Sequence, residues 1–211
     1  MTSQWLYRAL EESRARGFLG PVAIETQIEH ASGFIRVWDD FSSDPPTQYL
    51  DLGSGGGLPG LVLFEHWGSP TTFLDSMIKR TNFLDEVLGW EGAPSGGQVI
   101  NGRAEELSRD SDLEGQFSLV TARSFGPPAV TAECAVRFLS VGGLLIVSEP
   151  PNDDEIDRWN PSALGQLGLH SEGRVRHGAA FHVLRKVRPT PVRYPREIGT
   201  PGKNPLFLCF T

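Results

Sequence analysis

The chain has 211 residues and a formal net charge of −7. This length predicts one domain with a sizeable core, and the acidic balance argues against nucleic-acid binding by overall charge. No apolar run approaches the roughly 18 residues of a membrane span, and the N-terminus lacks the apolar segment of a signal peptide. We therefore expect a cytoplasmic protein with no membrane partner.

The first 46 residues are expected to form two helices that pack against the domain that follows. Residues 3–16 form an amphipathic pattern, and Pro21 can open a second helix. One face of this second helix carries an apolar set at helical periodicity: Ile24, Ile28, Ala31, Ile35 and Trp38. His30 lies on the neighbouring face, where a surface or packed histidine is favoured over a ligand.

From residue 48 onward, strands and helices alternate, which predicts an α/β fold with a doubly wound, mostly parallel sheet. Strands are expected at 48–52, 72–75, 98–101, 117–121 and 143–148. Helices are expected at 58–67, 78–90, 104–109, 128–139 and 153–167. Two further strands, 172–177 and 180–187, are close in sequence and should pair antiparallel at the sheet edge. Residues 188–205 hold five prolines, too many for a regular element.

The stretch from Tyr49 to Gly60 concentrates the sequence signals for ligand binding. It predicts a buried strand, a glycine turn and then a helix from Leu58 with Pro59 in its first turn. Glycine carries no Cβ, so a ligand can approach the backbone closely. The unpaired N–H groups at the helix start would also suit an anionic group.

Two nucleotide-type ligands compete for this loop. A dinucleotide fold requires G-x-G-x-x-G, but Leu58 occupies the third glycine position. The spacing Gly53-x-Gly55-x-Gly57 instead resembles the S-adenosylmethionine (SAM) loop of Rossmann-like methyltransferases. Either ligand needs an acidic residue after the second strand, and Asp75 has that position. The third interpretation, a glycine turn without a ligand, would cost backbone entropy for no return.

Ligands of such sheets lie beyond the carboxyl ends of the strands. This rule selects Gly53–Gly57, Asp75–Ser76, Gly102–Glu105 and Ala122–Ser124. Glycine backbone would meet the amino-acid end of a cofactor, Asp75 its ribose, and the 103–105 turn its adenine. Arg103 and Arg123 are our candidates for holding a substrate phosphate or base, because arginine forms forked hydrogen bonds. For each arginine the alternative is a salt bridge to Glu105, Asp75 or a neighbour.

Several motifs occur together in one order: Asp51–Gly60 (Asp-Leu-Gly-Ser-Gly-Gly-Gly-Leu-Pro-Gly), Asp75–Leu84, Gly102–Leu107, Thr121–Ser124 and the ending Arg193-Tyr-Pro-Arg196, Gly199-Thr-Pro201, Lys203. Together they resemble the 16S ribosomal RNA 7-methylguanosine methyltransferases, once called glucose-inhibited division protein B. The resemblance covers most of residues 48–147 and resumes at about 179–206. It implies a bacterial cytoplasmic enzyme that transfers the SAM methyl group to a guanine of 16S rRNA, with the small ribosomal subunit as partner.

The resemblance also implies a division of the chain and a set of site residues. The regions are an N-terminal helical cap (1–46), a SAM-binding methyltransferase domain (47–187) and a basic, proline-rich C-terminal tail (188–211), forming one compact unit. The expected cofactor-binding residues are Gly53, Ser54, Gly55, Gly57, Leu58, Asp75, Ser76, Ala104, Glu105 and Arg123. The candidate RNA-binding residues are Lys79, Arg80, Arg193, Arg196 and Lys203.

The chemistry of the implied reaction agrees with these residues. Nitrogen 7 of guanine has a free lone pair on an exposed edge, so no general base is expected and alignment with the methyl group is the main contribution. Phe125-Gly-Pro-Pro128 follows the fourth strand, instead of the Asn/Asp-Pro-Pro-aromatic motif of exocyclic amine methylation. Cys134 and Cys209 have no metal or redox spacing, which predicts packed thiols and no metal.

Charge and one departure from the family pattern bear on the substrate. Residues 185–203 hold six basic residues against Glu197 alone, a strip that could bind phosphate or form a solvated tail. Where the family's fifth strand ends in Lys-Gly, this chain has Glu149, which would repel phosphate. Two alternatives therefore stay open: a diverged methyltransferase acting on a small molecule or another RNA, and a non-catalytic SAM-binding protein.

Overall fold

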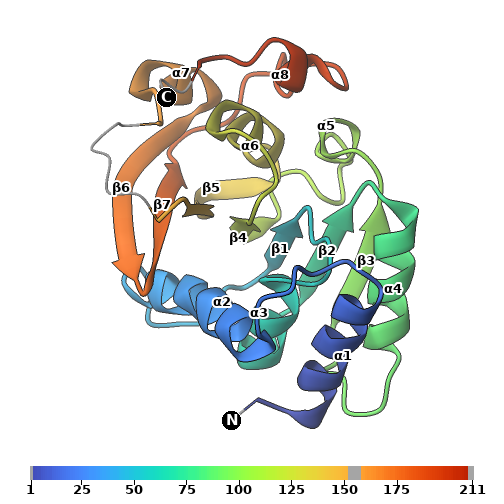
Figure 1. Cartoon of the computed structure of the whole chain (residues 1–211). Helices are drawn as coiled ribbons and strands as arrows, with labels where there is room; N and C mark the ends of the chain where they lie inside the picture. Colours follow the sequence, from blue (N-terminus) through green and yellow to red (C-terminus); the bar gives the residue numbers. More distant parts are fainter. Residues whose placement is uncertain (1, 152–157, 209–211) are drawn as a thin grey trace.

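The computed structural model describes residues 2–151 and 158–208, which build a seven-stranded sheet covered by helices on both faces (Figure 1). The strands are β1 Tyr49–Leu52, β2 Thr71–Asp75, β3 Gly97–Asn101, β4 Phe117–Ala122, β5 Leu139–Glu149, β6 Leu169–His177 and β7 Ala179–Lys186. Their spatial order is β3-β2-β1-β4-β5-β7-β6. The first five are parallel, and β7 is antiparallel to both β5 and β6. The predicted doubly wound fold is confirmed.

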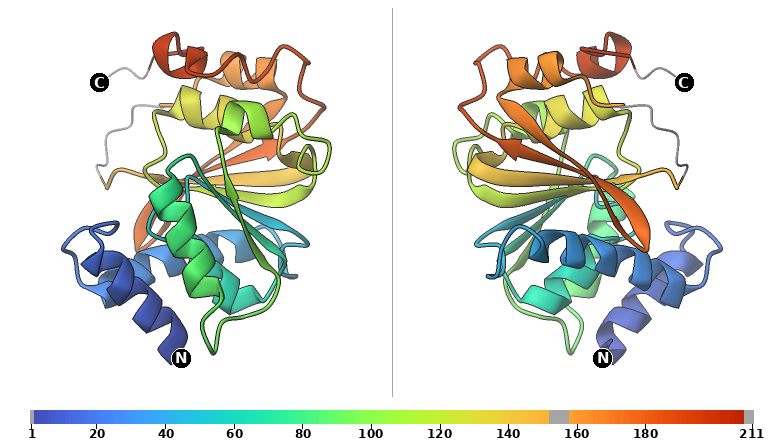
Figure 2. Two further views of the ribbon diagram at one scale, coloured as in Figure 1. Left: turned by 90° about the vertical axis from the view of Figure 1, so that its right-hand side faces the viewer. Right: turned by 90° about the vertical axis from the view of Figure 1, so that its left-hand side faces the viewer.

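Eight helices lie in the described part of the chain: α1 Gln4–Ala15, α2 Ile24–Asp39, α3 Gly60–Trp67, α4 Ile78–Leu88, α5 Ala104–Leu107, α6 Pro128–Ala135, α7 Pro161–Leu167 and α8 Thr200–Lys203. The first four cover one face of the sheet, and α5 to α8 cover the other (Figures 1 and 2). No helix of the described residues is long and apolar enough to cross a membrane.

Each face of the sheet supplies its own hydrophobic core, because successive side chains of a strand point to opposite sides. Tyr49 and Leu119 join the core beneath α1 to α4, whereas Leu50 and Val120 join the core beneath α6 and α7. All four side chains are fully buried. The central strands are therefore covered on both sides, as expected of a parallel sheet.

The two N-terminal helices pack against the sheet, as predicted. The α2 helix contacts α3, β6 and β7, and a Cβ atom at Gly33 would lie 2.6 Å from the ring of Phe181. The Ser13 hydroxyl on α1 donates a 2.7 Å hydrogen bond to the carbonyl oxygen of Gly56. The back of the glycine loop thus rests on α1. The α2 helix begins at Ile24, later than the predicted start at Pro21.

Several predicted boundaries are wrong at the helix ends. The α6 helix ends at Ala135, because the chain then enters β5 at Leu139, which pairs with Phe117. The α7 helix begins at Pro161, where the Asn160 side chain accepts a hydrogen bond from the Ala163 amide, 3.0 Å away. Residues 153–157 of the predicted helix, and Cys209, lie outside the described residues.

The proline-rich segment after β7 contains one regular element, contrary to the prediction. Thr200–Lys203 form the single helical turn α8, with Pro201 in its first turn, where a missing N–H has no helical partner to lose. Tyr194 and Phe207 are buried in the core beneath α6 and α7. The C-terminal segment therefore folds onto the same face of the sheet as α6 (Figure 2).

Candidate functional site

The glycine loop follows β1 directly. Gly53, Gly55 and Gly57 have φ angles of 72°, 55° and 98°, a region that side chains other than glycine rarely occupy. A Cβ atom at Gly53 would also lie 2.6 Å from the ring of Phe125. The loop therefore needs glycine both for its backbone conformation and for its packing.

Asp75, at the end of β2, holds the glycine loop in place. Its Oδ2 atom accepts a hydrogen bond from the Gly55 amide at 2.9 Å, and its Oδ1 atom accepts one from the Met77 amide at 2.8 Å. The Arg80 guanidinium lies 3.5 Å from Oδ2. A carboxylate offers about four lone-pair sites, so Asp75 can accept further hydrogen bonds from a ligand.

The start of α3 differs from the prediction. The helix begins at Gly60, and the Gly60 amide donates a 3.2 Å hydrogen bond to Oδ2 of Asp51. Asp51 also accepts a hydrogen bond from the Thr121 hydroxyl at 2.9 Å, and burial raises its pKa to about 6. The next amide, Leu61, bonds to the Gly57 carbonyl. The expected anion site at this helix terminus is thus taken by the protein's own carboxylate and backbone.

A cavity of about 260 Å³ opens beyond the carboxyl ends of β1 to β4; we call it the glycine-loop cavity. Nine predicted residues line it: Gly53, Asp75, Ser76, Arg80, Gly102, Arg103, Ala104, Glu105 and Ser124. The other predicted residues lie outside this lining. Ser54 is buried against the Asp51 carbonyl, and Leu58 is buried in the core beneath α1 to α4.

Sequence reasoning missed several lining residues: Leu74, Met77, Phe125, Val130, Cys134, Gly199 and Gly202. Phe125 had a usable signal, because it follows the β4 strand at the ligand-binding edge. Cys134 is a free cysteine in the wall of the glycine-loop cavity. Burial raises its pKa, so its side chain is a neutral thiol. Gly199 and Gly202 line the cavity only because the C-terminal segment folds back against it.

Glu105 connects two sides of the glycine-loop cavity. Its Oε1 atom accepts hydrogen bonds from Arg103 Nη2 at 2.9 Å and from the Gly199 amide at 3.1 Å. Burial raises the pKa of Glu105, but these hydrogen bonds outweigh burial and lower it below its usual range. The alternative stated for Arg103, a salt bridge to Glu105, is therefore present in the structure.

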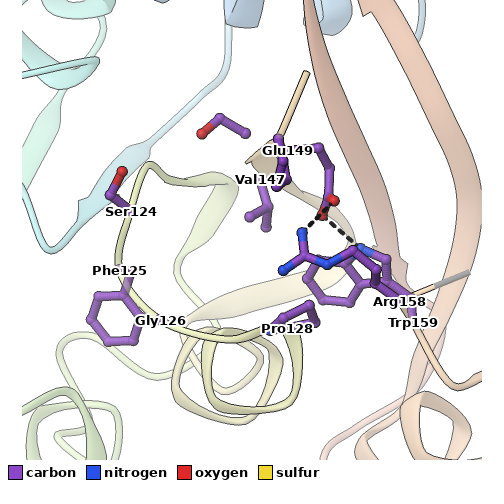
Figure 3. A pocket seen from close by; sticks show the side chains of 10 residues that line it. Ser124, Phe125, Gly126, Pro128, Val147, Glu149, Arg158 and Trp159 are labelled. Atoms are coloured by element: carbon purple, nitrogen blue, oxygen red, sulfur yellow. Dashed lines mark hydrogen bonds and ion pairs between the residues drawn. The ribbon is translucent and has the colours of Figure 1, made fainter. Parts of the chain in front are cut away.

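A second cavity, of about 280 Å³, lies at the end of β5, and we call it the β5 cavity (Figure 3). Its lining includes Val147, Glu149, Pro128 and Trp159, and it shares Ser124 and Phe125 with the glycine-loop cavity. Ser124 has a φ of 55°, a strained conformation for a residue with a side chain. The two cavities thus meet at one strained turn after β4.

Arg123 and His30 form a group beside the glycine loop. Sheet register places Ala122 opposite Leu52, so Arg123 is level with Gly53. Arg123 Nη1 and His30 Nδ1 are buried without a hydrogen-bond partner among the described residues. Burial, together with the Arg123 charge, lowers the pKa of His30 to about 4, and burial lowers the pKa of Arg123. The His30 imidazole is therefore neutral, and the Arg123 guanidinium keeps one donor, Nη1, without a partner among the described residues.

Comparison with known proteins agrees with this geometry. Residues 15–157 match the family model described as rRNA small subunit methyltransferase G. The ribosomal RNA small subunit methyltransferase G of Lactococcus lactis subsp. lactis is 33% identical over 176 residues, spanning 78% of this chain and 71% of that protein. The Symbiobacterium thermophilum protein of the same name is 34% identical over 180 residues, spanning 77% and 71%. This chain belongs to the rRNA small subunit methyltransferase G family.

The resemblance drawn from the motifs is thereby confirmed.

Solved structures of low sequence identity show the same fold. An SAH-bound methyltransferase from Podospora anserina has a TM-score of 0.59 at 14% identity, covering 89% of each chain. The cofactor-bound protein Rv0187 from MTB has a TM-score of 0.59 at 17% identity, covering 90% of this chain and 92% of that one.

Glu149 departs from the family's Lys-Gly pattern, but its charge is compensated. Arg158 Nη1 lies 2.6 Å from Glu149 Oε2, and Trp159 Nε1 donates to Oε1 at 2.9 Å (Figure 3). The Glu149 side chain is 5% exposed. The repulsion of phosphate expected from the sequence is therefore offset by an adjacent guanidinium, so the substitution does not leave a bare negative charge in the β5 cavity.

The five candidate RNA-binding residues have different environments. Lys79, Arg193 and Lys203 are exposed. Arg80 is partly engaged by Asp75, and Arg196 Nη2 pairs with Glu133 Oε2 at 2.7 Å. Glu133 is fully buried. Arg196 is therefore held by a buried carboxylate, and drawing it away to bind phosphate would leave that carboxylate without its cation.

Proposed function

We propose that this protein transfers the methyl group of SAM to nitrogen 7 of a guanine in the 16S rRNA of the small ribosomal subunit. The observation that carries the proposal is the meeting of two cavities at Ser124 and Phe125. The glycine-loop cavity offers glycine backbone and the Asp75 carboxylate, which suit a nucleoside. The β5 cavity has room for a base. Because the substrate is a ribosome component, we propose a cytoplasmic location.

The residues around the glycine-loop cavity fit SAM as the cofactor. Bare backbone at Gly53 would face its amino-acid end, Asp75 would accept hydrogen bonds from its ribose hydroxyls, and Ala104 and Glu105 would border its adenine. The free donor of Arg123 would suit its carboxylate. When bound, SAM supplies an electrophilic methyl group on a sulfonium.

The β5 cavity is the proposed site of the guanine. Its walls offer apolar and aromatic surfaces from Pro128 and Trp159, and Phe125 stands at the boundary with the glycine-loop cavity. Nitrogen 7 has a free lone pair, so these residues need only orient the base, exclude water and align the two reactants. No side chain is required to remove a proton before attack.

The test is methyl transfer from labelled SAM to small ribosomal subunits from a strain that lacks the modification, followed by mapping of the methylated nucleotide. We expect label in one guanine of 16S rRNA, at nitrogen 7. Label in another RNA or in a small molecule would support the diverged-enzyme alternative. Tight SAM binding without incorporation into any subunit preparation would support the non-catalytic alternative.

A further inference from the structure

The C-terminal segment 193–203 forms part of a cavity wall. Gly199 and Gly202 line the glycine-loop cavity together with Glu105. The Gly199 amide donates a 3.1 Å hydrogen bond to Glu105, from a position 94 residues further along the chain. A segment that sequence charge marks as an RNA-binding tail therefore borders the nucleoside site directly.

This segment is attached to the domain at several points. Tyr194 is 4% exposed, and the Pro195 carbonyl accepts a 2.7 Å hydrogen bond from Arg109 Nη2. The Arg196 guanidinium binds Glu133 through both carboxylate oxygens, with Nε at 2.9 Å from Oε1 and Nη2 at 2.7 Å from Oε2. The Arg196 amide also donates to Oε1, at 2.8 Å. Three hydrogen bonds thus join one residue of the segment to one carboxylate.

The partner carboxylate belongs to α6, the helix that supplies another part of the cavity wall. Glu133 is on α6 and fully buried, and its neighbours on that helix, Val130 and Cys134, line the glycine-loop cavity. The Arg196–Glu133 pair therefore joins the α6 wall to the C-terminal wall. A forked pair on a buried carboxylate sets distance and orientation together, because each carboxylate oxygen has its own donor.

We propose that Arg196 and Glu133 are positioning residues for the adenosine half of the cofactor. They hold the C-terminal segment against α6 so that the Gly199 amide stays on Glu105 and the wall keeps its shape. This inference rests on the proposed function for the identity of the ligand. It assigns Arg196 to cofactor binding and leaves RNA contact to the exposed basic residues of the segment.

The experiment measures, by calorimetry, the binding of SAM and of 5′-methylthioadenosine, which keeps the adenosine half and a methylthio group but lacks the amino-acid chain. Arg196→Lys keeps the charge without the fork, and Glu133→Gln keeps the side-chain shape without the charge. We expect each to weaken binding of both ligands about tenfold, since a misplaced wall must be ordered on binding. In turnover assays the KM for SAM should rise, while the KM for ribosomal subunits stays near that of the wild type.

Arg193→Ala is the matched control, because Arg193 is exposed and lies over the Tyr194 ring in the same segment. It should leave both ligand affinities unchanged. Thermal unfolding of each variant shows whether it is folded. If Arg196→Lys and Glu133→Gln are folded and bind both ligands as tightly as the wild type, the proposal is wrong. A lower RNA affinity of Arg196→Lys, with unchanged ligand affinity, would return Arg196 to the RNA site, because lysine keeps the charge but loses the forked contact to phosphate. Wild-type protein that binds neither ligand would instead refute the proposed function.

Discussion

The Gly55 amide donates a 2.9 Å hydrogen bond to the carboxylate of Asp75, so the glycine loop and the acidic residue of the candidate site form one hydrogen-bonded unit. The same carboxylate accepts from the Met77 amide at 2.8 Å. The residue that the sequence selects for ribose binding thus also holds the glycine loop in its conformation.

Asp75→Asn should weaken SAM binding. The amide keeps one acceptor oxygen but turns a donor toward either Gly55 or Met77, and it removes the charge that strengthens hydrogen bonds to ribose. The expected loss is about 1.5–3 kcal/mol, or roughly 10- to 150-fold in Kd. Calorimetry with Asp85→Asn, an exposed position on α4, as control checks the effect. Equal affinities in the two variants would remove Asp75 from the site.

Arg158→Ala should lower methyl transfer to ribosomal subunits without changing SAM affinity. The substitution leaves the largely buried Glu149 carboxylate without its 2.6 Å guanidinium partner, in the cavity proposed for the guanine. We expect about a tenfold fall in kcat/KM for the RNA, because like charges brought together at an interface are costly. Adding Glu149→Gln should restore most of the activity. A double variant as impaired as Arg158→Ala would show that charge compensation is not the reason.

His30 should make stability depend on pH. Its pKa is about 4 in the folded protein, against 6.5 for an ordinary histidine, so the unfolded chain binds the proton first. Stability is therefore lost as pH falls from about 6.5 to 4, by about 1–2 kcal/mol after allowance for partial exposure. His30→Phe cannot titrate and suits a site beside the Phe34 and Phe181 rings.

The measurement is urea unfolding of the wild type and His30→Phe at pH values from 7 to 4. The difference between the two proteins isolates His30, because Asp51, with a pKa of about 6, is present in both. The wild type should lose stability relative to His30→Phe as the pH falls. Parallel pH profiles would show that His30 is not held neutral by its surroundings.

Lys203→Ala should reduce the salt dependence of binding to small ribosomal subunits. Lys203 is exposed on α8, in the most basic strip of an otherwise acidic chain. One lost phosphate contact should lower the slope of log K against log salt by about 0.7–0.9. Filter binding between low and moderate salt measures it, with Arg14→Ala on α1, far from α8 (Figure 1), as control. An unchanged slope in Lys203→Ala would place the RNA elsewhere.

Much of the fold and of the candidate site could be predicted from short stretches of the sequence. The strand positions follow from short apolar runs, and the loop from Gly53 to Gly57 follows from backbone conformations that other residues avoid. Asp75 and Glu105 could be selected because parallel strands bring their carboxyl ends to one edge. Both line the glycine-loop cavity. These features could be predicted because each depends on residues that lie close together in the sequence.

Only the tertiary structure decided which charges remain available. Arg196 faces Glu133 across 63 residues, and the Asp51 carboxylate caps α3, where the sequence predicted a free anion site. Glu149 is compensated by Arg158, and the positive φ of Ser124 marks the meeting of the two cavities. A charge acquires its role from its nearest partner in space, and for groups distant in sequence that partner is set by how the elements pack, which no local pattern of residues encodes.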